Sequence, residues 1–281
     1  MKQLSARIIS HQQVIGGLER PAARSTSGSW LMWLKCPGIA GEAVPGQFVM
    51  VRCGAESVLP RPFSLHRVND NGDIALLYAV WEGGKGTGWL SRRQAGDKIE
   101  LFGPLGNGFS VFPASRHLLL VAGGMGIAPL RFLADVAVRQ KKAVTLLMGA
   151  LSAGHLLPDA SPPQELPTDG IPPFKVNIIK ITEDGSAGFK GLATDLIVNH
   201  IDRVDQVFAC GPVGMYRTMA ALSESFPKLK SAQVSLEMRM ACGLGTCYGC
   251  TIKTRRGLAQ VCRDGPVFDL QDVDWEALRP L

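Results

Sequence analysis

The chain has no apolar run long enough to cross a membrane. Its longest apolar stretch, residues 118–138, contains Arg131 and Asp135 and is broken by glycines, so we expect a buried strand, a turn and a helix there. The N-terminal segment MKQLSARIISHQQV lacks the apolar core of a signal peptide. These absences predict a protein with no membrane partner and no export signal.

The chain also has no concentrated charge and no internal repeat. Lys and Arg number 30 against 24 Asp and Glu, a net charge of +6, but the basic residues are scattered. Nucleic-acid-binding proteins gather basic residues on one face, so we expect no nucleic-acid partner. An acidic protein partner would suit this surplus of positive charge better.

With 281 residues, the chain is long enough for two domains and a small appendage. Residues 1–113 are predicted to be all-β, because short apolar runs recur between turn signals, as in a barrel or sandwich. These runs are residues 30–34, 47–51, 74–80 and 98–101. A short helix is predicted at 88–94.

From about residue 114, strand patterns alternate with helical ones, which predicts a parallel sheet with helices on both faces. The expected strands are 117–121, 144–148, 176–179 and 206–209, and the expected helices are 127–140, 192–200 and 212–223. Residues 151–174 contain six prolines and are expected to form a surface loop.

Residues 237–281 are rich in cysteine and glycine and too few to build their own hydrophobic core. Four cysteines there follow the spacing C-x4-C-x2-C-x11-C: Cys242, Cys247, Cys250 and Cys262. The first three match the plant-type [2Fe–2S] ligand run, and a bound cluster would hold the segment together. Glycines at 243, 245 and 249 are expected to take positive φ and turn amides toward the sulfurs.

Two alternatives remain for these cysteines, a structural zinc site and a pair of disulfides. Zinc sites more often show two C-x2-C pairs, and the chain has one. Seven cysteines without an export signal indicate a reducing compartment, so we expect a cytoplasmic protein.

Two motifs in the all-β part suit a flavin nucleotide. In RPFS (61–64), which we expect to follow a strand, Arg61 offers a planar set of donors, Phe63 can stack on a flat ring and Ser64 can hydrogen-bond a ring nitrogen. The glycine-rich GGKGTG (83–88) leads into the predicted short helix, whose free amides suit a pyrophosphate. Either motif alone is equally compatible with an ordinary turn.

Two loops in the α/β part suit a dinucleotide. AGGMGIAPL (122–130) lies between a predicted strand and helix, and CGPVGM (210–215) follows another strand, so both are expected at the carboxyl edge of the sheet. Neither is G-x-G-x-x-G, which disfavours an ordinary Rossmann FAD site. Cys210 is either a small buried residue or a direct participant in the chemistry. No arginine follows the strand ending at Met148, which predicts NAD rather than NADP.

In order and spacing, these motifs resemble the ferredoxin–NADP reductase superfamily over nearly the whole chain. TEDGSAGFKG (182–191), EMRMAC (237–242) and CRDGPVF (262–268) resemble more narrowly the electron-transfer subunits of NAD-linked bacterial dihydroorotate dehydrogenases. The resemblance implies an α+β multidomain fold, with an antiparallel β-barrel flavin domain (1–113), an α/β parallel-sheet nucleotide domain (114–236) and a small C-terminal [2Fe–2S] module (237–281).

The resemblance also implies the site residues, though it assigns no catalytic acid or base. For FAD they are Arg61, Pro62, Phe63, Ser64, Tyr78, Ala79, Val80, Gly86 and Thr87. For NAD they are Gly123, Gly124, Gly126, Cys210, Gly211 and Pro212, and for the cluster the four cysteines. Phe63 departs from the superfamily's R-x-Y-S, which keeps the ring and loses a hydroxyl.

The implied function is electron transfer in pyrimidine biosynthesis. Electrons from dihydroorotate enter at the FMN of a separate catalytic subunit in a heterotetramer, and pass to the cluster, to FAD and to NAD⁺. The chain shows no second flavin domain, so it should not oxidise dihydroorotate alone. One alternative is the diaphorase subunit of a hydrogenase, a sulfite reductase or a ferredoxin:NADP transhydrogenase-like complex. Another is a zinc-stabilised nucleotide-binding regulator without redox turnover.

A cluster that passes electrons to another protein must lie near the surface. The residues around it, Met238, Met240, Leu244 and Tyr248, are then expected either to be exposed as an interface core or to pack onto the α/β domain.

Overall fold

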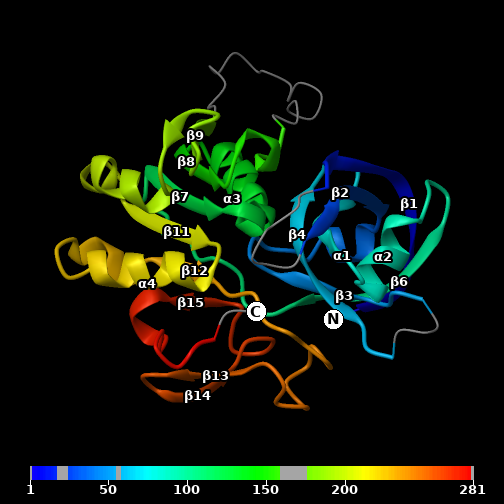
Figure 1. Ribbon diagram of the computed structural model, residues 1–281. Coiled ribbons are helices and arrows are strands. Elements are labelled where there is room, and N and C mark those ends of the chain that lie inside the picture. The colour runs from blue at the N-terminus through cyan, green and yellow to red at the C-terminus, as the bar shows by residue number, and fades with distance from the viewer. Residues whose placement is uncertain (1, 18–24, 55–57, 159–175, 280–281) are drawn as a thin grey trace.

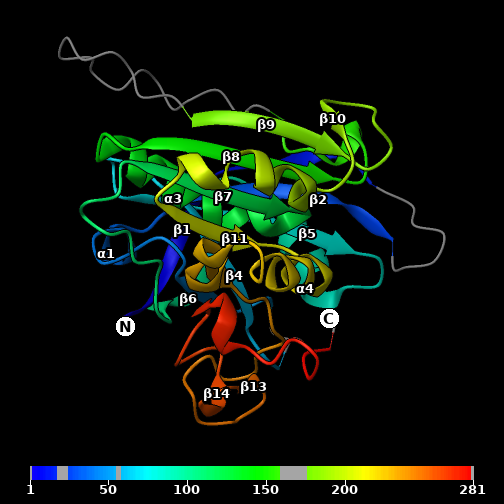
Figure 2. The ribbon, with the colours of Figure 1, turned by 90° about the vertical axis from the view of Figure 1, so that its left-hand side faces the viewer.

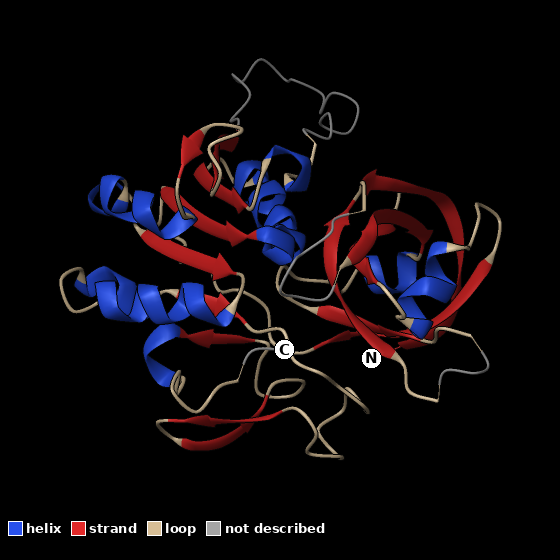
Figure 3. Cartoon of the chain, in the orientation of Figure 1, coloured by secondary structure: helices blue, strands red, loops and turns tan. Residues whose placement is uncertain are grey.

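The computed structural model describes residues 2–17, 25–54, 58–158 and 176–279 (Figure 1). A closed barrel lies beside a sheet flanked by helices, and a small C-terminal hairpin lies below both (Figure 3). This arrangement is the predicted fold class. Most of the predicted proline-rich loop, from residue 159 onward, lies outside the described residues.

The barrel has six strands in the closed order β1-β2-β5-β4-β3-β6, with antiparallel neighbours throughout. They are β1 (Lys2–Ile15), β2 (Thr26–Lys35), β3 (Phe48–Val51), β4 (Arg61–Val68), β5 (Asp73–Trp81) and β6 (Lys98–Leu105), with the short helices α1 (Pro37–Ala40) and α2 (Lys85–Ser91). RPFS begins β4 rather than following a strand, and the predicted helix at 88–94 begins three residues earlier, at Lys85. β1 was not predicted because it is largely polar, although Ala6 and Ile8 are buried.

The second sheet has the order β10-β9-β8-β7-β11-β12-β15. Its parallel strands are β7 (His117–Gly123), β8 (Ala143–Ala150), β9 (Val176–Thr182), β10 (Phe189–Lys190), β11 (Gln206–Cys210) and β12 (Gln233–Ser235). Only β15 (Val267–Asp269) among the described strands of this sheet runs antiparallel.

The predicted helices cover both faces of this sheet (Figure 2). Alternate residues of β7 divide between two cores. Leu118 and Leu120 pack with α3 (Ile127–Arg139), whereas Leu119 and Val121 pack with α4 (Val213–Leu222) and η3 (Ala193–Asn199). The helix predicted at 192–200 is thus a 3₁₀ helix. The other short 3₁₀ helices are η1 (Gly124–Gly126), η2 (Ala153–His155), η4 (Ile201–Arg203), η5 (Pro227–Ser231) and η6 (Leu270–Asp272).

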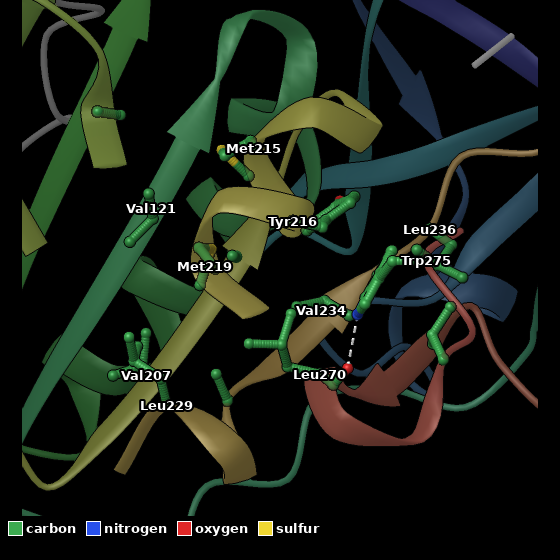
Figure 4. Packing of buried hydrophobic residues seen from close by; sticks show 14 of the residues in the cluster. Val121, Val207, Met215, Tyr216, Met219, Leu229, Val234, Leu236, Leu270 and Trp275 are labelled. Carbon is green, nitrogen blue, oxygen red and sulfur yellow. Dashed lines mark hydrogen bonds between the residues drawn. The ribbon is translucent and has the colours of Figure 1, made fainter. Parts of the chain in front are cut away.

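The C-terminal segment is attached by more than a bound cluster. It forms the hairpin β13 (Thr251–Thr254) and β14 (Gly257–Gln260), and then contributes β15 to the sheet. Trp275 stacks on Tyr216 of α4 with ring centroids 4.9 Å apart, and its indole N–H donates to the Leu270 carbonyl at 2.8 Å (Figure 4). The expectation that the cluster alone holds this segment is therefore corrected, because one hydrophobic core continues across residue 237.

Buried polar contacts join the barrel to α3. Arg67 of β4 donates to Asp135 at 2.7 Å, and Arg131 donates to the same carboxylate at 3.1 Å. His66 is fully buried, and its Nδ1 lies 3.0 Å from the Ala128 carbonyl. Burial lowers the pKa of His66 to about 3, so the ring is neutral and Nδ1–H is the donor. These contacts fix the barrel against the sheet.

Along the part of the chain that the structure describes, none of the helices combines the length and the apolar character that a membrane crossing requires.

Candidate functional site

A cavity of about 710 Å³ opens where the barrel meets the carboxyl edge of the parallel sheet, a size within the range of small-molecule sites. The barrel wall comes from the end of β1 and from β2 and β5, including Ile15, Ser29, Leu77, Ala79 and Trp81. The opposite wall comes from the two predicted dinucleotide loops and from the ends of β8 and β9.

The two loops touch each other through glycines. A Cβ added at Gly126 would overlap the carbonyl oxygen of Cys210, and one at Gly123 would lie 2.7 Å from Pro212 Cδ. Gly124 has φ +54°, a conformation that other residues seldom adopt. These glycines let the loops close together, and Gly123, Gly124, Gly126, Gly211 and Pro212 all line the cavity.

Cys210 is the last residue of β11 and the first of the second loop, and it is fully buried. Burial, chiefly, raises the pKa of its thiol well above the ordinary value, so the thiol stays protonated. Tyr216 holds the loop above it, since the Gly211 N–H donates to the Tyr216 hydroxyl at 2.9 Å and that hydroxyl donates to the Ser235 carbonyl at 2.7 Å. Sequence reasoning missed this role for Tyr216, because an aromatic residue on an apolar helix face is ordinary.

The flavin residues predicted on β4 and β5 lie on adjacent strands. Pro62, Ser64 and Ala79 are partly exposed, whereas Phe63, Tyr78 and Val80 are buried in the barrel core. Phe63 is 7% exposed, and its ring packs edge-on against that of Tyr78 with centroids 5.4 Å apart. Stacking of Phe63 on a flavin therefore stays a prediction, and Ala79 is the predicted FAD residue that lines the cavity.

The hydroxyl of Tyr78 already has a partner. It lies 2.8 Å from His11 Nε2, and His11 Nδ1 lies 2.7 Å from the Arg93 carbonyl. Because a carbonyl only accepts, Nδ1 carries the hydrogen and Nε2 accepts from Tyr78. Burial raises the pKa of Tyr78, so this hydroxyl remains a neutral donor within the barrel.

Arg61 and the first turn of α2 form a donor set. Arg61 Nη1 donates to the Leu59 carbonyl at 2.7 Å. A Cβ at Gly86 would lie 3.3 Å from Arg61 Nε, so the guanidinium is adjacent to Gly86, the residue before Thr87. A guanidinium beside the free amides of a helix start is the donor chemistry that a pyrophosphate requires. The sequence motifs RPFS and GGKGTG are thus brought together.

The cysteine loop has tight backbone turns and lies against the barrel. Gly243 and Gly245 have φ +69° and +80° as predicted, but Gly249 does not take positive φ and Tyr248 does, at 59°. The expectation for Gly249 was wrong by one residue. A Cβ at Gly243 would lie 2.6 Å from Met50 Cγ, so the loop contacts β3 directly.

Three of the four thiols receive hydrogen bonds from the backbone. Amide N–H groups donate from Leu244 to Cys242 Sγ at 3.3 Å, from Gly245 to Cys262 Sγ at 3.1 Å, and from Cys262 to Cys250 Sγ at 3.4 Å. Such bonds are one means of setting a cluster potential. All seven cysteines are free of disulfides.

The pKa values of two of the predicted ligands, Cys242 and Cys262, are shifted in opposite directions. Burial opposes ionisation of Cys242, but hydrogen bonds from Thr246 and from the Leu244 amide outweigh it and lower the pKa to about 5. Burial and the neighbouring Cys250 raise the pKa of Cys262 to about 12. Within the described ranges, no three His, Cys, Asp or Glu side chains surround the position of a single ion; a [2Fe–2S] cluster has two thiolates on each iron.

Comparisons with known families agree with this geometry. Residues 237–274 match the family described as the iron–sulfur cluster binding domain of dihydroorotate dehydrogenase B, and residues 35–109 match the oxidoreductase FAD-binding domain. A Desulforamulus reducens protein, named dihydroorotate dehydrogenase B (NAD⁺), electron transfer subunit, is 36% identical over 88% of this chain and 93% of its own length. A protein of the same name from Caldanaerobacter subterraneus subsp. tengcongensis is 38% identical over 82% of this chain and 86% of its own.

The chain belongs to the family of dihydroorotate dehydrogenase B electron transfer subunits. It is an oxidoreductase subunit with an FAD-binding domain and an iron–sulfur binding domain. The zinc alternative is thereby disfavoured.

Solved structures extend the likeness to the fold. An NADH-dependent reduced ferredoxin–NADP oxidoreductase involved in flavin-based electron bifurcation superposes with a TM-score of 0.78 at 26% identity, over 96% of this chain and 90% of that one. A Neisseria gonorrhoeae ferredoxin–NADP⁺ reductase with bound FAD and NADP gives 0.62 at 15% identity, over 80% of this chain and 92% of that one.

The surface around the electron transfer subunit's cysteine loop divides the four residues predicted there. Met238 and Met240 pack against the hydrophobic core, whereas Leu244 is 46% exposed and Tyr248 is 72% exposed. Cys247, between the exposed pair, is itself exposed. Leu244 and Tyr248 are thus exposed and Met238 and Met240 are packed against the core, while an interface role for the exposed pair stays a prediction.

Proposed function

We propose that this chain carries electrons between a dihydroorotate-oxidising subunit and NAD⁺, through a [2Fe–2S] cluster at the cysteine loop and an FAD on the barrel. The observation that carries the proposal is that the barrel contacts both ends of this path. Ala79 lines the cavity beside the dinucleotide loops, and Met50 of β3 contacts Gly243 in the cysteine loop. FAD exchanges two electrons with a nicotinamide and single electrons with a cluster, chemistry that belongs to the cofactor.

Residues of the barrel would hold FAD. Arg61, together with the amides of Gly86 and Thr87, would bind the pyrophosphate, since these donors lie together. The partly exposed Pro62, Ser64 and Ala79 would contact the ring system. Phe63, Tyr78 and Val80 would support it from the barrel core.

Residues of the two glycine loops would hold the nicotinamide nucleotide. Gly123, Gly124, Gly126, Gly211 and Pro212 line the cavity, and the four glycines add no side chain to its wall. Cys210 supports the loop as a neutral thiol. Cys242, Cys247, Cys250 and Cys262 would bind the cluster, and the limits 1–113, 114–236 and 237–281 would divide the three functions.

The partner would be an FMN-containing catalytic subunit in a heterotetramer. It would dock over Leu244, Cys247 and Tyr248, because this is where a predicted cluster ligand reaches the surface beside exposed apolar side chains. The names of the relatives, which describe an electron transfer subunit, support a separate catalytic chain.

The test is reconstitution with that catalytic subunit. Dihydroorotate-dependent reduction of NAD⁺ should require both chains, and neither chain alone should catalyse it. If the pair forms a stable complex and shows no such activity, while this chain reduces a ferredoxin or a hydrogenase partner with NADH, the diaphorase function holds instead.

A further inference from the structure

The end of the cavity formed by the start of η3 contains a buried hydroxyl. Thr194 lines the cavity, is 3% exposed, and its Oγ1 has no hydrogen-bond partner in the described residues. A buried polar group without a partner is costly, and native proteins rarely keep one unless a ligand or water engages it. The hydroxyl is thus positioned for a ligand with polar groups at this end.

Local structure fixes the position of Thr194. A Cβ at Gly149, at the end of β8, would lie 2.9 Å from the Cβ of Ala193, so the start of η3 is packed over the end of β8. Asp195 accepts from the Leu192 N–H at 2.7 Å and holds the first turn. Thr194 is therefore held rigidly beside the strand that follows the first dinucleotide loop.

Glu183 also lines the cavity, and it comes from the neighbouring strand end. Its backbone N–H donates to the Ala150 carbonyl at 3.1 Å, continuing the register in which Thr182 pairs with Ala150. Adjacent strands are about 4.8 Å apart, so the carboxylate stands one strand away from the end of β8. It is exposed, and no ion pair involves it among the described residues.

This placement matters because of how dinucleotide folds choose their ligand. They usually have an acidic residue at the end of the second strand, where it accepts from the adenosine ribose 2′-hydroxyl and disfavours a 2′-phosphate. Here that position has Gly149, Ala150 and Leu151, with no acid and no base. Glu183 supplies a carboxylate at the same edge of the sheet, just after the end of the neighbouring strand β9.

We propose that Thr194 and Glu183 form the adenosine-ribose end of the nucleotide site. Thr194 hydrogen-bonds a ribose hydroxyl, and Glu183 accepts from the 2′-hydroxyl and repels a 2′-phosphate. The pair selects NAD(H) over NADP(H). This inference rests on the proposed function, because it assumes that the cavity binds a nicotinamide dinucleotide.

The experiment follows anaerobic reduction of the FAD by NADH and by NADPH in stopped flow, with the intact FAD-loaded chain. Thr194→Val, which is close in shape, should raise the apparent Kd for both nucleotides about tenfold, as loss of one hydrogen bond to a buried group predicts. The limiting rate should not change, because the nicotinamide end is intact. Thr194→Ser, which restores a hydroxyl, should recover most of the affinity.

Glu183→Gln should weaken NADH binding and strengthen NADPH binding, so that the NADH:NADPH preference falls by about tenfold or more. The matched control is Asp184→Asn, the next acidic residue, whose carboxylate is already engaged by Ser186 through bonds of 2.6 and 2.9 Å. It should leave the preference unchanged.

Unchanged Kd values in Thr194→Val and an unchanged preference in Glu183→Gln would overturn the inference, and a wild-type protein still reduced by NADH would leave the proposed function standing. A wild-type protein whose FAD neither nucleotide reduces would overturn both.

Discussion

The side chain of Asn107, just after the last strand of the barrel, donates to the carbonyl of Asp264 at 3.0 Å. It also donates to the Arg263 carbonyl at 3.3 Å, and its backbone N–H donates to Gly265 at 2.6 Å. These acceptors directly follow Cys262, a predicted cluster ligand. The barrel and the cysteine-rich segment are thus joined by hydrogen bonds next to a predicted cluster ligand.

Replacing Asn107 with Ala should therefore loosen the cluster segment without affecting the flavin. Two exposed hydrogen bonds are lost, worth about 1 kcal/mol together. We expect iron to leave the variant about fivefold faster in the presence of a ferrous chelator, with FAD content unchanged. The matched control is Asn177→Ala, an exposed asparagine on β9. Equal iron loss in Asn107→Ala and the wild type would show that the contact does not support the cluster.

Arg61→Ala should weaken FAD binding. A charge-assisted bond to the pyrophosphate is worth about 1.5–3 kcal/mol, so the affinity should fall roughly ten- to hundredfold. Flavin fluorescence after dilution measures it. Arg52→Ala is the control, since Arg52 is exposed and bonds Glu100 at 3.2 Å. Full flavin occupancy in Arg61→Ala after gel filtration would remove Arg61 from the FAD site.

Stability should fall in acid because of His66. Folding lowers its pKa from 6.5 to about 3, chiefly by burial, so between these values the unfolded chain binds the additional proton. The contribution of the neutral His66 to the free energy of unfolding is therefore complete above pH 6.5. It is lost as pH falls toward 3, by at most about 1.4 kcal/mol per pH unit. His66→Asn keeps an amide donor for Ala128 and does not titrate. The wild-type Tm should decrease more steeply than that of His66→Asn from pH 6.5 to 5, and parallel curves would contradict this role.

Leu244→Glu should interfere with the partner and not with NADH. A charge in the proposed docking surface would weaken the complex and suppress dihydroorotate-dependent NAD⁺ reduction, with reduction of FAD by NADH intact. Leu258→Glu is the matched control, because Leu258 is a 79% exposed leucine on β14, in the same module. Full coupled activity of Leu244→Glu, with normal binding to the partner, would place the docking surface elsewhere.

Much of the fold could be predicted because its signals are local. The cysteine spacing that indicated an iron–sulfur domain and the strand–glycine–helix order of 118–138 depend on neighbours in the sequence. The domain and the order of the elements were both confirmed, and the four ligands stay a prediction. The strand β1 was not predicted because its pattern is mostly polar. The strand β15 was not predicted because a short strand at a sheet edge has no periodicity of its own. Thr194, Tyr216 and Asn107 could not be found from the sequence, since their roles depend on partners brought close only by folding.

The most direct test of the electron path is an anaerobic titration of the purified chain with NADH, followed by absorbance and by electron paramagnetic resonance. We predict bleaching of the flavin band together with the signal of a reduced [2Fe–2S] cluster. Cys247→Ser, which replaces a soft ligand by a hard one, should show the bleaching without the signal, whereas Cys36→Ala, a buried cysteine outside the loop, should show both. A wild-type chain in which NADH reduces FAD while an intact cluster stays oxidised would contradict the proposed path.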